Sequence, residues 1–227
     1  MRARRARLLG RLVVVGWAAL LAALAVDAVR EPDHERPTPS SAAGEAAASF
    51  VDAWERSRLA TFVTVGTYRR HSEVTGAEIA SEDVLAQRPP RRLHRQLGGV
   101  DGRDDDRLLV CPAPPPGQDP APCHLGPPGG PTYEESVARE VAGLEDLVLG
   151  DDPLYAVTAG DPGCYELDLR RADPRAPFGI AATFCFDDET GAPTLRRVQH
   201  PEGVVEELVV TTVRAEVTDA DLEPPEP

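Results

Sequence analysis

The alternation of apolar and polar positions predicts a mostly β chain with two helices. Residues 45–58 and 132–149 carry apolar residues at helical spacing, and Thr132 with Glu135 forms a capping box at the start of the second segment. Shorter β-branched and aromatic runs between turn residues are typical of strands. The order of helix, strands, helix and a long antiparallel meander indicates an α+β fold with one large sheet. Strands are expected at residues 61–70, 78–87, 91–97, 107–110, 154–158, 164–170, 178–186, 194–198 and 204–217, with a loop across residues 98–106.

The first 29 residues read as a membrane anchor or a signal peptide. Residues 1–11 are cationic, and residues 12–26 are an unbroken run of apolar or small residues. With residues 8–10 this run approaches the ~20 residues that a membrane-spanning helix needs. The triplet 23–25 (Ala-Leu-Ala) also fits the small-residue rule for signal peptidase, so retention and cleavage both stay open. Either way we expect the rest of the chain outside the cytoplasm, held at the cell membrane by a single helix or secreted.

Composition divides the remainder of the chain. Residues 30–41 are polar and rich in proline and serine, which indicates a disordered linker, and residues 223–227 read as a similar tail. The folded domain is therefore expected at residues 42–222.

The charge of the chain excludes one class of partner. Its 24 basic residues, all arginine, face 38 acidic residues, and the net charge is −14. Six arginines and one acid lie in the first 30 residues, so residues 31–227 carry 18 arginines, 37 acids and a charge of −19. A surface this acidic repels phosphate backbones, and we expect no nucleic-acid partner.

Two apolar-rich runs on either side of residues 172–175 pair as a β-hairpin in one register. In that register Tyr165 faces Phe184 and the other apolar side chains share their face, while the acidic residues fall on the opposite face. A slip of one residue would mix the two faces, so the register is well specified. It also sets Cys164 opposite Cys185, at a separation that a disulfide can bridge.

The four cysteines are an even set, which in an exported chain favours two disulfides. Spacing alone allows three connectivities. The hairpin register selects Cys164–Cys185, which leaves Cys111–Cys123 to close a proline-rich loop. The alternative of a zinc site would need close ligand pairs such as C-x-x-C, and none occurs.

Motifs for catalysis, metal binding or nucleotide binding are missing from the sequence. It contains no G-x-S-x-G elbow, P-loop, G-x-G-x-x-G or H-E-x-x-H. The run at residues 101–106 has glycine and arginine where a calcium loop needs ligands, so it reads as a solvated turn. The five histidines lack partners at ligand spacing, and the adjacent Glu206 and Glu207 face opposite ways on a strand. We therefore expect a non-enzymatic protein with no cofactor and no metal.

Residues 184–225 resemble the C-terminal half of the half-barrels of the LolA, LppX and LprG type. The shared features are an Asp-x-x-Thr-Gly-x-Pro turn at residues 187–193, a long strand, and an aspartate-containing segment at residues 219–222 before proline. Residues 88–92 resemble the family's strand with an Arg-Pro step, and residues 61–70 its first curved strand. The resemblance implies a strongly curved antiparallel sheet, or half-barrel, with helices on its concave side and a cavity for acyl chains. The chain departs from the lipoprotein members, since no cysteine comes directly after its N-terminal apolar run and the first one is Cys111.

Two functions fit this resemblance. The first is extracytoplasmic binding or carriage of a lipid or other apolar ligand between the concave face and the second helix. The second is a membrane-anchored sensor or interaction module of the cell envelope that regulates a protein partner. The same apolar residues would equally well form a closed core. The candidate cavity residues are Val137, Val141, Leu144, Tyr165, Leu167 and Phe184.

Overall fold

The computed structural model describes residues 41–114 and 122–224, which belong to one compact unit spanning residues 39–227. The predicted anchor or signal peptide at residues 1–29, the predicted linker up to residue 40 and the end of the predicted tail lie outside the described residues. None of the helices in the described part is long and apolar enough to cross a membrane.

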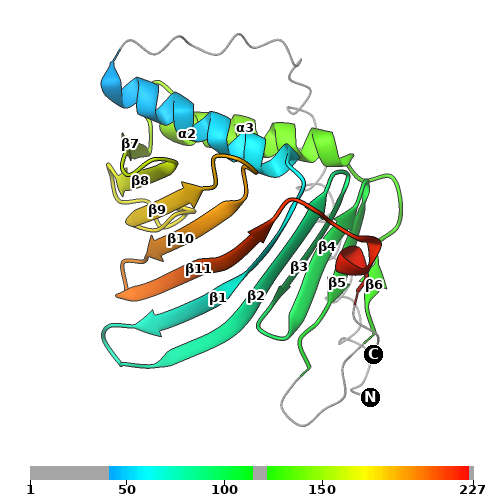
Figure 1. The fold of residues 1–227 in the computed structure, drawn as a ribbon. Helices are drawn as coiled ribbons and strands as arrows, with labels where there is room; N and C mark the ends of the chain where they lie inside the picture. Colours follow the sequence, from blue (N-terminus) through cyan, green and yellow to red (C-terminus); the bar gives the residue numbers. More distant parts are fainter. Residues whose placement is uncertain (1–40, 115–121, 225–227) are drawn as a thin grey trace, which may run out of the picture. The chain divides into compact units, whose positions relative to one another are not determined.

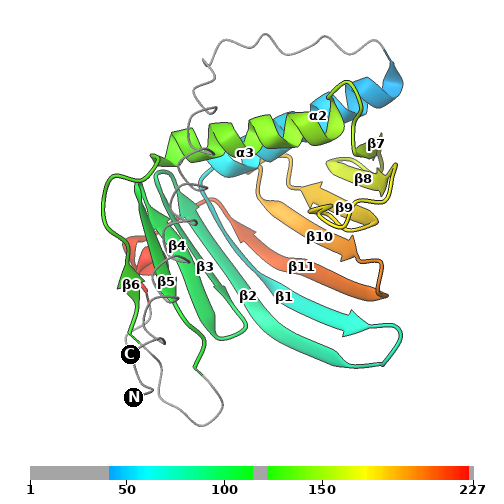
Figure 2. The same ribbon diagram turned by 180° about the vertical axis from the view of Figure 1, so that it is seen from behind.

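Within the described residues, eleven antiparallel strands form one strongly curved sheet (Figure 1 and, from behind, Figure 2). The spatial order is β6-β5-β4-β3-β2-β1-β11-β10-β9-β8-β7. The chain therefore starts in the middle of the sheet, builds one half outward, crosses to the far edge through α3, and returns strand by strand until β11 pairs with β1. The strands are β1 Phe62–Ser72, β2 Glu78–Arg88, β3 Arg91–Gln96, β4 Gly99–Asp104, β5 Arg107–Cys111, β6 His124–Leu125, β7 Tyr155–Ala159, β8 Cys164–Leu169, β9 Ala181–Phe186, β10 Pro193–Gln199 and β11 Val204–Arg214.

Two helices pack against each other and lie across the concave face of the sheet (Figure 1). Helix α2 (Ala42–Leu59) begins at Ser41, whose side chain accepts a hydrogen bond from the backbone of the first turn. Helix α3 (Tyr133–Val148) begins with the predicted capping box, in which Thr132 and Glu135 each accept a backbone hydrogen bond from the other residue. These caps satisfy backbone N–H groups that the start of a helix leaves without a partner.

The main core lies between the two helices and strands β7 to β10. Phe50 on α2 is fully buried, and its ring centroid lies 5.4 to 6.5 Å from those of Tyr165, Phe184 and Phe186. Burial of these rings stabilises the contact between helix and sheet, because each ring removes a large apolar area from water. Helix α3 adds the predicted apolar stripe of Tyr133, Val137, Val141, Leu144 and Val148.

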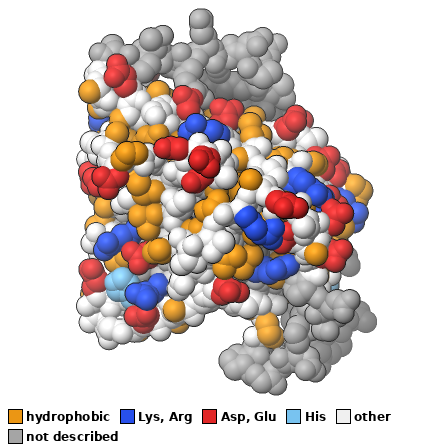
Figure 3. Space-filling view, in the orientation of Figure 1, with side chains coloured by type: hydrophobic (Ala, Val, Ile, Leu, Met, Phe, Trp, Pro, Cys, Tyr) orange, Lys and Arg blue, Asp and Glu red, His pale blue; other side chains and the backbone are white. Residues whose placement is uncertain are grey.

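A second, smaller core lies on the convex face of strands β1 to β5. There the segment that follows β11 folds back over the sheet, and its residues Val217 and Leu222 pack in one cluster with Leu93 and Val100. The segment includes the short helix η1 (Asp219–Leu222). Figure 3 shows arginine and acidic side chains interspersed over this side of the molecule. The ion pairs that hold the segment are Arg88–Asp219, Arg91–Asp219 and Arg214–Asp221.

The prediction of a loop at residues 98–106 is wrong. This segment contains β4, which pairs with β3 on one side and with β5 on the other. Its sequence is rich in glycine and aspartate, which are depleted in strands, so local preference argues against a strand here. A Cβ atom at Gly102 would lie 2.6 Å from the carbonyl oxygen of Arg92, so the close approach of β3 requires glycine. Pairing on both sides overrides the local preference.

The predicted hairpin register and both predicted disulfides are confirmed. Strands β8 and β9 pair so that Cys164 lies directly opposite Cys185, and the two Cα atoms of this bridge are 4.0 Å apart. The second bridge joins Cys111 at the end of β5 to Cys123 just before β6, with 4.1 Å between the Cα atoms. Each bridge therefore links two neighbouring strands in its half of the sheet.

Replacing Cys164 and Cys185 together with serine should lower the free energy of unfolding by about 3 kcal/mol, because the bridge restricts the unfolded chain. Urea-induced unfolding followed by circular dichroism measures this loss. The matched Cys111/Cys123 double variant opens a shorter loop (a separation of 12 residues against 21) and should lose less. An equal or larger loss at Cys111/Cys123 would contradict the loop-entropy explanation.

Candidate functional site

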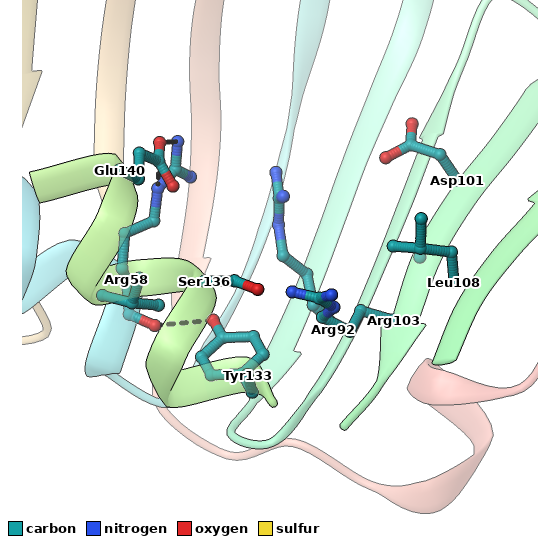
Figure 4. A pocket seen from close by; sticks show the side chains of 10 residues that line it. Arg58, Arg92, Asp101, Arg103, Leu108, Tyr133, Ser136 and Glu140 are labelled. Carbon is teal, nitrogen blue, oxygen red and sulfur yellow. Dashed lines mark hydrogen bonds and ion pairs between the residues drawn. The ribbon is translucent and has the colours of Figure 1, made fainter. Parts of the chain in front are cut away.

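An open groove lies on the concave face where the helices leave the sheet uncovered. One cavity of about 170 Å³ lies between α3 and strands β3 to β5, and a second of about 100 Å³ lies between α2 and strands β2, β3, β9, β10 and β11. Arg58 and Arg92 line both cavities, so these two side chains lie between them. Figure 4 shows the first cavity, with strand residues such as Arg92 and Arg103 facing Tyr133 and Ser136 on α3. We call the two cavities together the concave groove.

The alternation of side chains along β3 supplies the polar wall of the groove. Arg92 and His94 line the groove, whereas Leu93 between them packs in the convex core. The register places Arg92 directly opposite Arg103 on β4, and His94 directly opposite Asp101. Arg92 and Arg103 are therefore a cross-strand pair of like charges, and His94 and Asp101 are a cross-strand pair of opposite charges.

His94 is held by carboxylates on both ring nitrogens. Its Nε2 atom lies 2.8 Å from Asp83 Oδ2, and its Nδ1 atom lies 3.3 Å from Asp101 Oδ1. Burial alone would lower the pKa of His94, but the hydrogen bonds to Asp101 and Asp83 outweigh it and raise this pKa to about 9. The hydrogen bond from His94 in turn lowers the pKa of Asp101. At neutral pH the imidazole is therefore charged and donates from both nitrogens, so it has no free position at which to accept a proton.

Arg58 lies at the end of α2 and is fixed through its side chain and its backbone. Its guanidinium donates to Glu140 on α3 at 2.6 Å and lies 4.8 Å above the ring of Trp54. Its carbonyl oxygen accepts from the Tyr133 hydroxyl at 2.6 Å. The buried Gln87 on β2 donates to this oxygen and to two other carbonyl oxygens at the end of α2, at 2.8 to 3.0 Å. The position of Arg58 in the groove is therefore set by α3 and the sheet together.

Three other arginines of the groove, Arg92, Arg103 and Arg196, have no carboxylate at ion-pair distance within the described residues; we call them the arginine trio. The Nε atom of each is buried and has no hydrogen-bond partner. The side chain of Arg103 donates once, to the carbonyl oxygen of Pro131 at 3.2 Å, while the side chains of the other two make no hydrogen bond to a described residue. Burial lowers the pKa of Arg92, and the nearby charge of Arg58 lowers it further.

The six residues predicted to line a cavity lie together in the main core. All are buried, and the cluster that they join also contains Phe50. The Tyr165 hydroxyl hydrogen-bonds Ser49 on α2 at 2.7 Å. Val137 also lines the first cavity and Phe184 the second. A ligand-contact role for the six stays a prediction, and only Val137 and Phe184 among them line the groove. The set is Val137, Val141, Leu144, Tyr165, Leu167 and Phe184.

Sequence reasoning missed the polar wall of the groove. Arg92 and His94 were assigned to a strand but not to a site, because nothing in the sequence places them beside Asp83, Asp101 or Arg103. One available signal is the single apolar residue in the run Arg-Arg-Leu-His-Arg-Gln of β3, which predicts one apolar face and one charged face. A charged face usually indicates solvent, and only the curvature of the sheet turns it inward.

Comparison with known proteins gives a distant structural likeness. No protein-family model matches the chain, and no curated protein sequence matches it. A crystal structure of MucB matches with 16% identity and a TM-score of 0.44, over 83% of this chain and 65% of that one. The complex of MucA and MucB from Pseudomonas aeruginosa matches with 14% identity and a TM-score of 0.44, over 79% of this chain and 61% of that one. This chain thus spans less than two thirds of the MucB chains.

The matches also include a protein from Nitrosomonas europaea that belongs to the LolA superfamily. The sequence resembles the same superfamily. The Nitrosomonas europaea protein has 10% identity and a TM-score of 0.33, over 78% of this chain and 97% of that one. These values describe a likeness of fold, so the case for function rests on the groove itself.

The carboxylate contacts of His94 should make stability depend on pH. A pKa of about 9 in the folded chain against about 6.5 in the unfolded chain stabilises the fold fully below pH 6.5. This stabilisation, about 3 kcal/mol, is lost as the pH rises through 9. The difference in unfolding free energy between the wild type and His94→Gln should shrink accordingly between pH 6.5 and 9.5. No free thiol among the described residues titrates in this range.

Urea unfolding at several pH values measures the difference, and the titration of the ring resonances by NMR gives the pKa directly. The exposed His124 on β6 offers a control, since His124→Gln should follow the wild-type curve. A constant gap between the wild type and His94→Gln would contradict the assignment.

Proposed function

We propose that this chain binds an amphipathic lipid outside the cytoplasm, with an apolar chain of the lipid lying in the concave groove. The observation that carries the proposal is the incomplete cover of the concave face. The helices close the half over β7 to β10 with packed rings, and the second cavity lies at the border of this packed half, where apolar side chains line it beside Arg92 and Arg196. We call this apolar lining the floor: Leu85 and Leu208 on the sheet, Trp54 on α2, and Phe184 and Phe186, whose buried rings also belong to the main core.

The size of the groove favours one hydrocarbon chain. Both cavities are smaller than the ~300–1,000 Å³ of sites that enclose drug-sized ligands. A single hydrocarbon chain along the floor therefore fits better than a whole lipid with two hydrocarbon chains. The rest of such a lipid would lie along the open side of the groove. Apolar contact drives this binding, since each buried CH₂ group contributes about 0.8 kcal/mol.

Binding rather than catalysis suits the groups that line the groove. The one histidine there has both nitrogens committed to carboxylates. The described residues hold no group of three or more side chains suited to bind a metal ion. A binding or carrier protein needs neither a base nor a metal.

The proposed location outside the cytoplasm follows from the cysteines and the N-terminal segment. Two disulfides form and persist in oxidising compartments. The apolar run at residues 12–26 supplies either a signal or a single anchoring helix. A chain that keeps the anchoring helix would hold its ligand at the membrane. A chain whose signal is cleaved would be free to carry the ligand away from the membrane.

The second candidate is an envelope sensor that binds a protein partner. One of the matched structures is a complex of MucB with its protein partner MucA. The uncovered groove would then receive a peptide segment in place of a lipid chain.

Filling the first cavity of the groove should weaken lipid binding. Ser136 lines the first cavity from α3, so Ser136→Phe inserts a ring into the space between α3 and β3. The full chain, purified in a mild maltoside detergent, should carry a lipid adduct in native mass spectra. The Ser136→Phe chain should lose the adduct and bind a fluorescent single-chain lipid at least ~10-fold more weakly, a change of about 1.4 kcal/mol.

Ala138→Phe is the matched control, because Ala138 lies on the exposed face of the same helix. It should bind the probe as the wild type does. A sharp ligand-free mass for the wild type, together with no uptake of the probe, would contradict the proposed function and favour the protein-partner hypothesis.

A further inference from the structure

We propose that Arg92, with Arg103 beside it in the first cavity and Arg196 in the second, forms an oxyanion site that binds the phosphate headgroup of the lipid. This inference rests on the proposed function, because it names the chemical class of the ligand for the same groove. A lipid phosphate and a free phosphate ion share the recognised group, and the experiment below distinguishes them.

The first argument is that no carboxylate of the described residues lies at ion-pair distance from the trio, although Asp101 and Glu140 line the first cavity and Asp83 lines the second. The sequence has 38 acidic residues against 24 arginines. On the convex face, Arg88, Arg91 and Arg214 lie in ion pairs with aspartates although they are partly exposed to water. The buried Nε atoms of the trio have no hydrogen-bond partner among the described residues, as is also true of Arg95 on the convex side, whose Nη2 atom donates to the carbonyl oxygen of Glu223. The charge that balances them is therefore expected to come from a ligand.

The second argument is the placement of like charges. Arg92 and Arg103 are directly opposite each other on neighbouring strands, an arrangement that destabilises a sheet when both side chains are charged. The charge of Arg58 repels that of Arg92 as well. The guanidinium of Arg58 already forms an ion pair with Glu140 and lies over the ring of Trp54. An anion between these side chains would remove the repulsion.

The third argument is the chemistry of the guanidinium group. Its fixed fork of N–H donors matches the oxygens of phosphate, and such charge-assisted bonds are about twice as strong as neutral ones. Arg92 shares the first cavity with Arg103 and the second with Arg196, so it lies where an anion in either cavity can reach it. The apolar floor begins in the second cavity, with Leu85 and Leu208 beside Arg196. A headgroup at Arg92 therefore leaves its hydrocarbon chain beside the floor.

Two probes with the same hydrocarbon chain test the inference. Lysophosphatidic acid carries a phosphate, and the matched monoacylglycerol does not. The full chain in a maltoside detergent should bind the fluorescent lysophosphatidic acid at least ~10-fold more tightly than the monoacylglycerol. The Arg92→Gln chain should lose this preference while it keeps the weaker binding of the monoacylglycerol. Arg95→Gln is the matched control, because Arg95 lies on the same strand and points to the convex side.

The outcomes separate this inference from the proposed function. Equal affinity for the two probes overturns the oxyanion site and leaves lipid binding intact. Failure of both probes overturns the proposed function. Strong binding of inorganic phosphate at Arg92 without uptake of either lipid overturns the assignment to a lipid headgroup, since the anion would then come from solution.

Thermal unfolding gives a second readout that does not depend on lipid. Removing an unpaired, repelled charge should raise the melting temperature of ligand-free Arg92→Gln above that of the wild type. A purely structural arginine would give the opposite shift. Lysophosphatidic acid should raise the melting temperature of the wild type and have little effect on Arg92→Gln.

Discussion

The end of α2 is the point on which the arrangement of helices and sheet depends. A helix terminus leaves carbonyl oxygens without partners, and here three of them converge on the side-chain amide of Gln87. Gln87 is fully buried on β2, so water cannot replace it. The hydroxyl of Tyr133 adds a bond from the first turn of α3 to the same terminus. The ends of both helices are thereby fixed to one place on the concave face.

This anchoring divides the concave face into two unlike halves. From the fixed end, α2 runs over β7 to β10, where Phe50 packs among aromatic rings and water is excluded. Strands β2 to β5 receive no such cover, and their inward side chains include Arg92, His94 and Asp83. One half of the curved sheet is therefore a core, and the other half is a wall of the groove. The fold needs the first half for stability, which leaves the second available for a ligand.

The distribution of charge agrees with this division. Ion pairs are frequent on the convex side, where each contributes little because water screens it. Within the groove, His94 has two carboxylates and Arg58 has one, but the arginine trio has none at ion-pair distance in the described part of the chain. Buried charges are normally paired, since removing a charge from water costs several kcal/mol. The uneven pairing inside the groove is the observation on which the proposed headgroup site rests.

Local patterns in the sequence were sufficient for several elements. The capping box at Thr132 and Glu135 fixes the start of α3 within one turn of chain, and alternation fixes the register that pairs Cys164 with Cys185. In both cases the interacting residues lie close in sequence or share a strict period of two. The same patterns failed for β4, because glycine and aspartate favour turns and only pairing with β3 and β5 makes a strand of them.

What the sequence by itself determined is the two helices, the hairpin register, both disulfides and the identity of the apolar faces. Only the tertiary structure decided which apolar faces close into a core and which charged residues meet inside the groove. Arg103 and Arg196 lie more than ninety residues apart in the sequence, yet both share a cavity wall with Arg92. Arg103 lies opposite Arg92 because β3 and β4 are paired, whereas the approach of Arg196 on β10 to Arg92 depends on the curvature of the sheet, a property of eleven paired strands that no local period encodes.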